Sequence, residues 1–276
     1  MKMIRYAAIV AALFAAVSCG AKKADAPKTL VLYYSQSATT KAVAEEIAGR
    51  VGADIEEILP VNPYDGTYQE TIQRSGQERE SGKLPELQPL KADLADYDVI
   101  FLGYPIWFGT YALPVATLLD QVDLSGKKVV PFCTFGSGGL DTSVKDLAAK
   151  QPGAEILPGY GVRSARMASM PKEIDAFLKA GGFVEGEAVK LDPFPEQHPV
   201  SEEESAIFDA AVSTYPMIRA KAATVASRAI PGGTEYLFTA NDLPREGMPA
   251  MPPSGGMKIY VTVEDGGAPE FTQVVR

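Results

Sequence analysis

Near its start the chain passes from an apolar run, through a short turn, straight into an amphipathic segment. Residues 30–34, LVLYY, are apolar and rich in β-forming side chains, the pattern of a strand buried on both faces of a parallel sheet. Val43, Ile47 and Val51 then recur at the spacing of one helix face, and charged residues occupy the opposite face. The sequence therefore predicts a buried strand that leads at once into a surface helix.

Hydroxyl side chains fill the turn between this strand and helix, which we call the first loop (residues 35–40, SQSATT). The first N–H groups of a helix have no intrahelical partner and carry the positive end of the helix dipole. Hydroxyls can complete a shell around a phosphate there without any Lys or Arg. The turn is therefore a candidate anion site, although Ser and Thr are also ordinary capping and turn residues.

Similar strand and helix signals alternate along the chain. Strands are expected at residues 54–59, 98–103, 127–134 and 155–159, and helices at residues 67–77, 114–119, 141–150 and 171–180. This alternation predicts a doubly wound α/β sheet, in which ligands bind outside the carboxyl ends of the strands. The loops that follow Tyr34, Leu102 and Cys133 are therefore the ones expected to form a site.

The other two of these loops have unusual compositions. The second loop, residues 103–111 (GYPIWFGTY), holds the only Trp of the chain among further aromatic residues. So many rings favour a planar ligand or a partner, or else a loop that folds back onto its own core. The third loop, residues 134–139 (TFGSGG), is rich in glycine, which either brings backbone N–H groups close to a ligand or makes a tight turn.

Taken together, the three loops resemble the cofactor loops of the flavodoxin-like family. The first loop is similar to the phosphate loop of that family, with Ala38 and Thr39 where the family usually has Gly-Asn. GYPIWFG resembles the common form Gly-x-Pro-Ile-Trp-Trp-Gly, and TFGSG resembles the third cofactor loop. The resemblance covers residues 29 to about 183 and implies a flavodoxin-like, doubly wound parallel sheet of five strands that binds FMN.

The resemblance also implies which residues hold the cofactor. The phosphate would lie in the first loop and the isoalloxazine ring between the other two, with Trp107 stacking on the ring or packing at its edge. The residues concerned are Ser35, Ser37, Ala38, Thr39 and Thr40 in the first loop, Pro105, Ile106, Trp107, Phe108 and Gly109 in the second, and Thr134, Phe135, Gly136, Ser137 and Gly138 in the third.

The implied chemistry is electron transfer through FMN, because this cofactor carries electrons singly or as hydride. The chain would be either an electron carrier or a small FMN-dependent reductase, with a redox partner protein or a small quinone-like substrate. No side chain is needed as a general acid, so no catalytic residue is assigned. An alternative is a flavodoxin fold that has lost FMN and serves as a binding scaffold, which the residues Ala38 and Thr39 suggest.

The first 19 residues have the features of an export signal. Lys2 and Arg5 precede an apolar stretch at residues 6–17 that is too short for a comfortable transmembrane helix. The ending AVSC resembles the lipobox of bacterial lipoproteins, in which Cys19 would carry the lipid; a plain signal peptide is the alternative. We therefore expect a lipoprotein signal peptide (1–19), a tether (20–28) and an exported protein of the cell envelope, on the periplasmic side and held to a membrane by its lipid alone.

The remaining chemistry-bearing residues favour no other site. The formal net charge of −9 argues against nucleic acid as a partner. The sequence has no metal-ligand spacing, no Walker loop and no convincing nucleophile triad. Cys133 ends an apolar strand and is expected to be a small buried residue, while His198 is expected in a Pro-rich linker.

A second domain is expected after the flavodoxin-like domain (29–185) and a linker (186–199). Residues 200–276 begin with a capping box at Ser201 and Glu204, followed by strand-like runs at 223–230, 235–240, 258–264 and 270–275. Residues 228–232 resemble the Gln-x-Val-x-Gly hairpin of cystatins, with Arg228 in place of the Gln, an inserted Gly, and no Trp for the second hairpin. This implies a small α+β cystatin-like domain, either a packing or docking module or, alternatively, an inhibitor of cysteine proteases.

Overall fold

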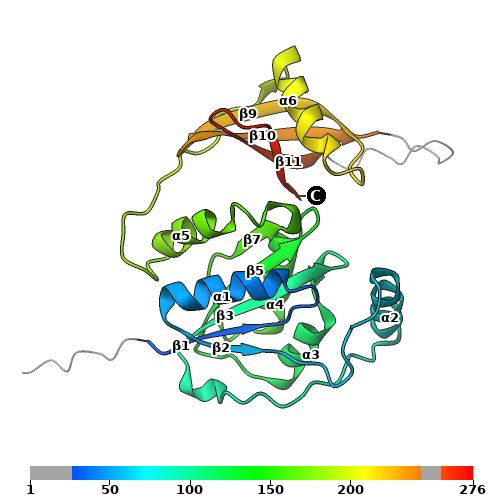
Figure 1. The fold of residues 1–276 in the computed structure, drawn as a ribbon, viewed down its shortest axis with the longest axis vertical. Helices are drawn as coiled ribbons and strands as arrows, with labels where there is room; N and C mark the ends of the chain where they lie inside the picture. Colours follow the sequence, from blue (N-terminus) through cyan, green and yellow to red (C-terminus); the bar gives the residue numbers. More distant parts are fainter. Residues whose placement is uncertain (1–26, 244–255, 276) are drawn as a thin grey trace, which may run out of the picture.

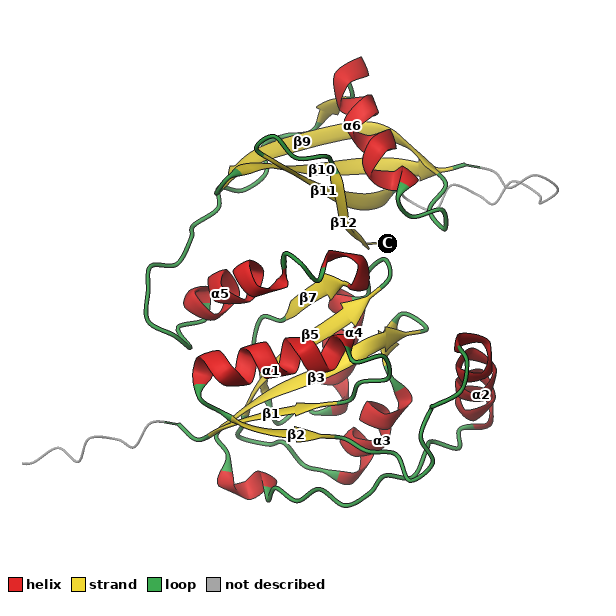
Figure 2. Ribbon diagram, viewed as in Figure 1, coloured by secondary structure: helices red, strands yellow, loops and turns green. Residues whose placement is uncertain are grey.

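The structure is a computed structural model that describes residues 27–243 and 256–275. Figures 1 and 2 show two domains, one above the other along the long axis of the molecule. The predicted signal peptide, including Cys19, lies outside the described residues. Within the described residues, no helix is both long enough and apolar enough to cross a membrane.

The first domain is built on a parallel sheet. Its strands are β1 (Thr29–Tyr33), β2 (Asp54–Glu57), β3 (Val99–Trp107), β5 (Lys128–Phe135), β6 (Glu155–Ile156) and β7 (Tyr160–Arg163). They follow the order β2-β1-β3-β5, and β6 and β7 share the fifth position because they pair with the start and the end of β5. The short β4 (Thr110–Tyr111) pairs antiparallel with the end of β3. The predicted flavodoxin-like sheet is confirmed.

Helices cover both faces of this sheet (Figure 2). The helices of this domain are α1 (Thr39–Val51), α2 (Tyr68–Ser81), α3 (Leu113–Gln121), α4 (Leu140–Lys150) and α5 (Met170–Ala180), with single 3-10 turns at Leu94–Asp96 and Ser164–Arg166. Successive strand residues point to opposite faces, so Val31 packs in the core that contains α1 and α5, while Leu30 and Leu32 pack in the core that contains α3 and α4. This explains the continuous apolar runs of the sequence.

The strand expected at residues 155–159 is wrong in one respect, because the structure divides this region into β6 and β7. The pairing reaches Ile156 opposite Val129 and resumes at Tyr160 opposite Phe132. Pro158 lies in the gap, and proline has no N–H group to donate to a sheet ladder. The chain therefore leaves the sheet at this point and rejoins it with β7, which ends at Arg163.

The second domain places one helix on an antiparallel sheet, as the α+β prediction requires. The helix is α6 (Glu202–Ser213), and the sheet has the order β12-β11-β10-β9-β8. Its strands are β8 (His198–Pro199), β9 (Ala220–Ile230), β10 (Gly233–Asp242), β11 (Met257–Glu264) and β12 (Glu270–Val275). The predicted capping box is present at Ser201 and Glu204. Phe208 of α6 meets Phe238 of β10 edge to face, with ring centres 5.1 Å apart.

The Pro-rich segment expected as a linker packs along the second domain. Arg228 of β9 donates to the carbonyl of Asp192 at 3.1 Å and lies 4.3 Å from the ring centre of Phe194. The side-chain oxygen of Gln197 accepts hydrogen bonds from the hydroxyls of Thr224 and Thr239. His198 belongs to β8 and pairs with β9. At least residues 192–199 are therefore attached to the second domain.

Candidate functional site

A cavity of about 740 Å³ lies where β1, β3 and β5 end. All three predicted loops contribute to its wall, so the structure brings together residues that are far apart in the sequence. The lining residues from these loops are Gln36, Ser37 and Thr39, then Pro105, Ile106, Trp107 and Phe108, and then Thr134, Phe135 and Gly136. The remaining lining residues are Tyr64, Asp65, Gly66, Tyr68, Thr71, Ile72, Ser75 and Ser164.

The first loop makes a left-handed turn immediately before α1. Ala38 has φ 63° and ψ −4°, a conformation that glycine adopts without steric cost, and it provides no side-chain cap. The hydroxyl oxygens of Ser37 and Thr39 lie 3.2 Å apart at the cavity wall. The first intrahelical bond is donated by Ala42 to the carbonyl of Ala38, so the N–H groups of Thr39 and Thr40 precede it. Ala38 therefore adopts the left-handed conformation for which glycine is the usual residue.

The other two predicted hydroxyls of the first loop hold the loop in place. Thr40 is buried, and its hydroxyl oxygen lies 2.8 Å from that of Thr134 at the end of β5. Ser35 accepts a hydrogen bond from the backbone N–H of Lys41 at 3.2 Å. These contacts tie the start of α1 to the sheet, and neither Ser35 nor Thr40 lines the cavity.

The segment expected as the second loop is mostly strand, because β3 continues to Trp107 and Thr110–Tyr111 form β4. This segment supplies an aromatic wall. Trp107 meets Tyr64 and Tyr34 edge to face, with ring centres 5.0 Å and 5.7 Å apart. On its outer side, the Tyr64 ring is covered by the guanidinium of Arg74 at 3.9 Å, and its hydroxyl donates to Glu78. Burial and then the hydrogen bond to Glu78 raise the pKa of Tyr64, which keeps this hydroxyl protonated. Trp107 thus packs on neighbouring rings and also faces the cavity.

Helix α2 forms a wall that the sequence analysis did not assign to the site. Gln36 of the first loop donates to the hydroxyl of Thr71 at 2.7 Å. Thr71 and Ser75 are buried, lie four residues apart on α2, and line the cavity. Two small polar residues at this spacing, on a helix whose other residues are mostly charged or amides, are the signal that could have revealed this wall.

The third loop is divided between the cavity and the second domain. Gly136 lines the cavity, while its carbonyl accepts a hydrogen bond from Arg163 at 2.8 Å. The carbonyl of Ser137 accepts from the backbone N–H of Val274 in β12 at 2.7 Å. A Cβ on Gly138 would lie 2.2 Å from the carbonyl oxygen of Val274. Glycine at position 138 is therefore required by the packing of β12, and neither Ser137 nor Gly138 lines the cavity.

The remaining candidate residues, Gly109 and Cys133, lie outside the cavity wall. Gly109 follows Phe108 at the tip of the second loop, where both have positive φ, and Gly109 does not line the cavity. Cys133 is fully buried, as predicted, and burial raises the pKa of its thiol. Among the described residues, no three His, Cys, Asp or Glu side chains lie close enough to hold a metal ion.

Comparisons with known proteins agree with this fold and cover the first domain. The sequence profile of the family described as flavodoxin matches residues 28–174. A candidate flavoprotein from Bacteroides eggerthii DSM 20697 is 30% identical, with a TM-score of 0.50 over 56% of this chain and 98% of that chain. One from Bacteroides uniformis ATCC 8492 is 31% identical, with a TM-score of 0.48 over 54% and 98%. A flavoprotein in complex with FMN from Lactobacillus acidophilus NCFM is 27% identical, with a TM-score of 0.46 over 54% and 97%.

The matched region contains every strand of the parallel sheet and the first part of α5. It also contains each residue that lines the cavity described above. The match extends over more than half of the chain and ends before the second domain begins. Through its first domain, the chain belongs to the flavodoxin family.

Proposed function

We propose that the first domain binds FMN in the cavity at the ends of β1, β3 and β5 and transfers electrons through it. The observation that carries the proposal is that the three loops resembling flavodoxin cofactor loops line one cavity. Its volume of about 740 Å³ lies within the range of roughly 300–1,000 Å³ that is usual for sites of small ligands. Membership of the flavodoxin family supports FMN as the cofactor.

The phosphate would be held by backbone and hydroxyl groups. No Lys or Arg lines the cavity, and Asp65 is its one charged lining residue in the described part of the chain. The N-terminus of α1 offers N–H donors and the positive end of its dipole, and Ser37 and Thr39 add hydroxyls beside it. The left-handed turn at Ala38 directs the chain into this arrangement, which argues against the alternative of a scaffold that has lost FMN.

The ring would lie against the aromatic wall and the third loop. When bound, FMN supplies one-electron or hydride chemistry, and the protein supplies position and surroundings. Trp107 is held by edge-to-face contacts with Tyr34 and Tyr64, so it can exclude water from one side of the cavity without losing these contacts. The protonated hydroxyl of Tyr64 donates its hydrogen bond to Glu78, so we assign this residue no role as a general acid in the cavity.

Two reaction types fit this site. An electron carrier would pass electrons to a redox partner protein, and a small reductase would pass them to a small quinone-like substrate. Measuring oxidation of NADH or NADPH by the FMN-loaded protein, with and without a soluble quinone, distinguishes them. Continuous oxidation of NADH or NADPH in the presence of the quinone supports the reductase. Reduction of the bound FMN without continuous oxidation of NADH or NADPH supports the carrier.

For the second domain we propose a cystatin-like fold. We propose that this domain serves as a packing or docking module and does not inhibit proteases. One helix packed on an antiparallel sheet supports the relation in shape. Arg228 is paired with Glu235 at 2.7 Å and also holds the segment at Asp192. The hairpin residue Gly232 lies beside Lys172 of α5 in the first domain. A hairpin in this position is not free to enter the active site of a protease. We therefore expect no inhibition when the protein is added to an assay of a papain-like cysteine protease.

We also propose that the chain is an exported lipoprotein, attached to a membrane on the periplasmic side of the cell envelope through a lipid on Cys19. The charged, apolar and small-residue regions of residues 1–19 support this location. Fractionation of cells that express the full chain should place it with membranes, and Cys19→Ser should release it. Equal recovery of both proteins in the soluble fraction would contradict the lipid anchor.

The test of the proposed function is reconstitution with FMN. The chain without residues 1–19 is mixed with FMN and desalted, and the absorbance of the retained flavin should correspond to about one FMN per chain. Trp107→Ala should weaken FMN binding, measured by quenching of FMN fluorescence, because it removes the fixed aromatic wall. Phe194→Ala, which alters an aromatic residue of the second domain away from the cavity, should not. A parent protein that leaves FMN fluorescence unquenched would refute FMN binding.

A further inference from the structure

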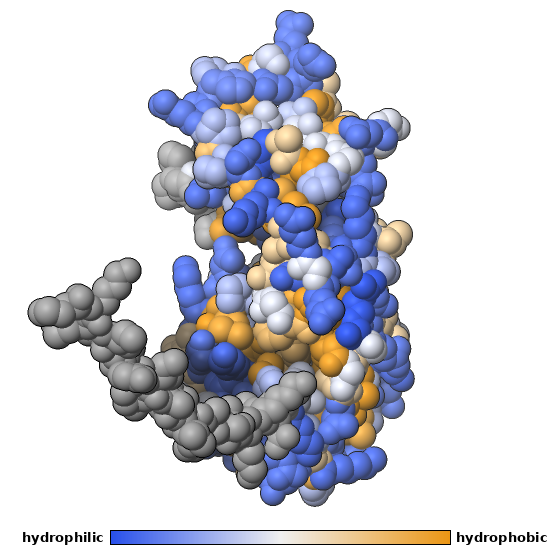
Figure 3. Space-filling view, turned by 90° about the vertical axis from the view of Figure 1, so that its left-hand side faces the viewer, coloured by the Kyte–Doolittle hydropathy of each residue, from blue (hydrophilic) through white to orange (hydrophobic). Residues whose placement is uncertain are grey.

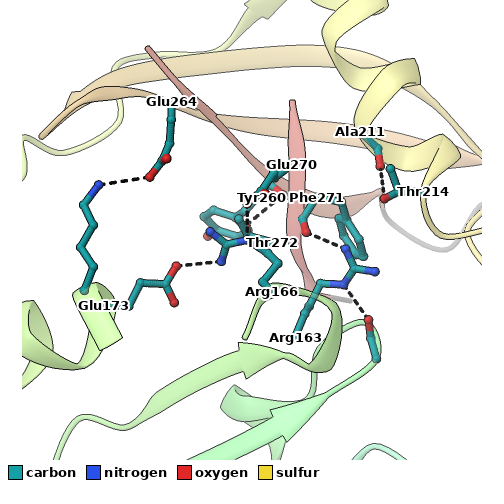
Figure 4. A network of polar contacts seen from close by, with 12 residues as sticks. Arg163, Arg166, Glu173, Ala211, Thr214, Tyr260, Glu264, Glu270, Phe271 and Thr272 are labelled. Atoms are coloured by element: carbon teal, nitrogen blue, oxygen red, sulfur yellow. Dashed lines mark hydrogen bonds and ion pairs between the residues drawn. The ribbon is translucent and has the colours of Figure 1, made fainter. Parts of the chain in front are cut away.

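The two domains meet at the third loop, at residues that line the cavity or follow those that do. The first domain contributes Gly136 and Ser137 of the loop and Arg163 at the end of β7, and the second contributes Phe271 and Val274 of β12. We call these five residues the interdomain node. Figure 4 shows Arg163 between the two domains, and in Figure 3 the surfaces of the two domains are in contact.

Arg163 connects the loop to β12 directly. Its Nε donates to the carbonyl of Gly136 at 2.8 Å, and its Nη1 donates to the carbonyl of Phe271 at 2.7 Å. The guanidinium lies 4.2 Å from the ring centre of Phe271 and 5.1 Å from that of Tyr215. Arg163 is only 4% exposed, and a buried cation is costly unless its donors are satisfied. Its position is therefore favourable only when the loop and β12 are both in place.

Backbone contacts strengthen the same connection. The N–H of Val274 donates to the carbonyl of Ser137, and the missing side chain of Gly138 lets the carbonyl of Val274 approach. A loop that contains three glycines in six residues loses much conformational freedom when it is fixed. The second domain fixes this loop before any ligand arrives, which is the usual physical basis of preorganisation.

We propose that Arg163 and β12 position the third loop for FMN, so that docking of the second domain and binding of FMN strengthen each other. The inference rests on the proposed FMN site, because Thr134, Phe135 and Gly136 of the same loop line that cavity. Linkage makes the effect reciprocal: if docking tightens FMN binding, then FMN stabilises docking by the same factor. Arg163 and Val274 are thus positioning residues that act through the loop.

Val274→Pro is the sharpest single test. Proline removes the N–H that reaches Ser137, and β12 is an edge strand, where proline is tolerated. Loss of one hydrogen bond to the loop should raise the Kd for FMN by about three- to tenfold. Arg163→Met removes both connections of the guanidinium and should raise the Kd further, while Arg163→Lys should restore part of the affinity.

A matched control comes from the same interface. Lys172 of α5 and Glu264 of β11 form an exposed ion pair at 3.1 Å that joins the domains without touching the loop. Glu264→Gln should therefore leave the Kd for FMN unchanged. The visible circular dichroism of bound FMN gives a second readout, and it should change in Val274→Pro and Arg163→Met but not in Glu264→Gln.

The reciprocal effect is measured by hydrogen exchange of the parent protein. FMN should slow exchange of the backbone amides in β12, residues 270–275, while leaving α6 unaffected. Parent-like Kd values and spectra in both Val274→Pro and Arg163→Met would overturn the inference while FMN binding stands. If Arg163→Met does not fold, Val274→Pro decides alone. A parent protein that does not bind FMN at all would instead refute the proposed function.

Discussion

Replacing Ala38 by glycine should stabilise the first domain and leave its phosphate turn intact. Ala38 has φ 63° in a turn that carries no side-chain cap, and its side chain is exposed. A residue with a Cβ loses about 1–2 kcal/mol in the left-handed region. Glycine removes that strain but has more freedom in the unfolded chain, which costs about 0.5–1 kcal/mol. The difference predicts a net gain of about 0.5–1 kcal/mol in the free energy of unfolding.

Urea unfolding of the FMN-free protein, followed by fluorescence of Trp107, measures this change in the first domain. Trp107 is the only Trp of the chain and lies in the same cavity wall as the first loop. Ala42→Gly is the matched control, because it places glycine inside α1, where it should destabilise by about 1 kcal/mol. An Ala38→Gly protein that is no more stable than the parent would refute the strain argument. Its Kd for FMN should be unchanged or lower.

Three further substitutions test the second domain and its docking. Gly138→Ala places a Cβ 2.2 Å from the carbonyl oxygen of Val274 and should lower the free energy of unfolding by about 1–3 kcal/mol in thermal unfolding. Gly136→Ala, whose Cβ would lie 3.1 Å from the hydroxyl of Tyr215, should lower the free energy of unfolding by less than Gly138→Ala does. Equal losses of stability in the two variants would contradict the docking geometry. Hydrogen bonds from Ser201 hold the pKa of Glu204 below its ordinary 4.5, so the charged carboxylate stabilises α6 above about pH 4.5 and that stability is lost as the pH falls further. Glu204→Gln should therefore reduce the fall in Tm between about pH 6 and pH 3, and a slope equal to the parent's would refute this origin.

Local sequence patterns predicted most of the fold, because strand burial, helix periodicity and helix capping depend on residues that are close together in the sequence. The apolar run at residues 30–34 and the spacing of Val43, Ile47 and Val51 correspond to β1 and α1 within one residue at the strand ends. The capping box at Ser201 marks the start of α6, because a Ser side chain and a Glu three residues later satisfy the first N–H groups of a helix. The family resemblance of the three loops then indicated where the cavity lies.

Two features of the structure differ from the sequence expectations for different reasons, one local and one distant. The run at residues 155–159 has strand composition, yet Pro158 interrupts its pairing with β5 and the chain forms β6 and β7. Helix α2 was expected, but its place in the cavity wall depends on the hydrogen bond between Gln36 and Thr71, which lie 35 residues apart. Pro158 is visible in the sequence, whereas the contact between Gln36 and Thr71 is decided only by the folded chain.

The third loop separates the two kinds of information most clearly. The sequence by itself determined a glycine-rich turn after an apolar strand, which is compatible with a ligand contact or with a tight turn. Only the tertiary structure decided that Gly136 faces the cavity while Ser137 and Gly138 face β12, which follows more than 130 residues later. Glycine permits many backbone conformations, and the contacts made by Arg163 and Val274 select one of them.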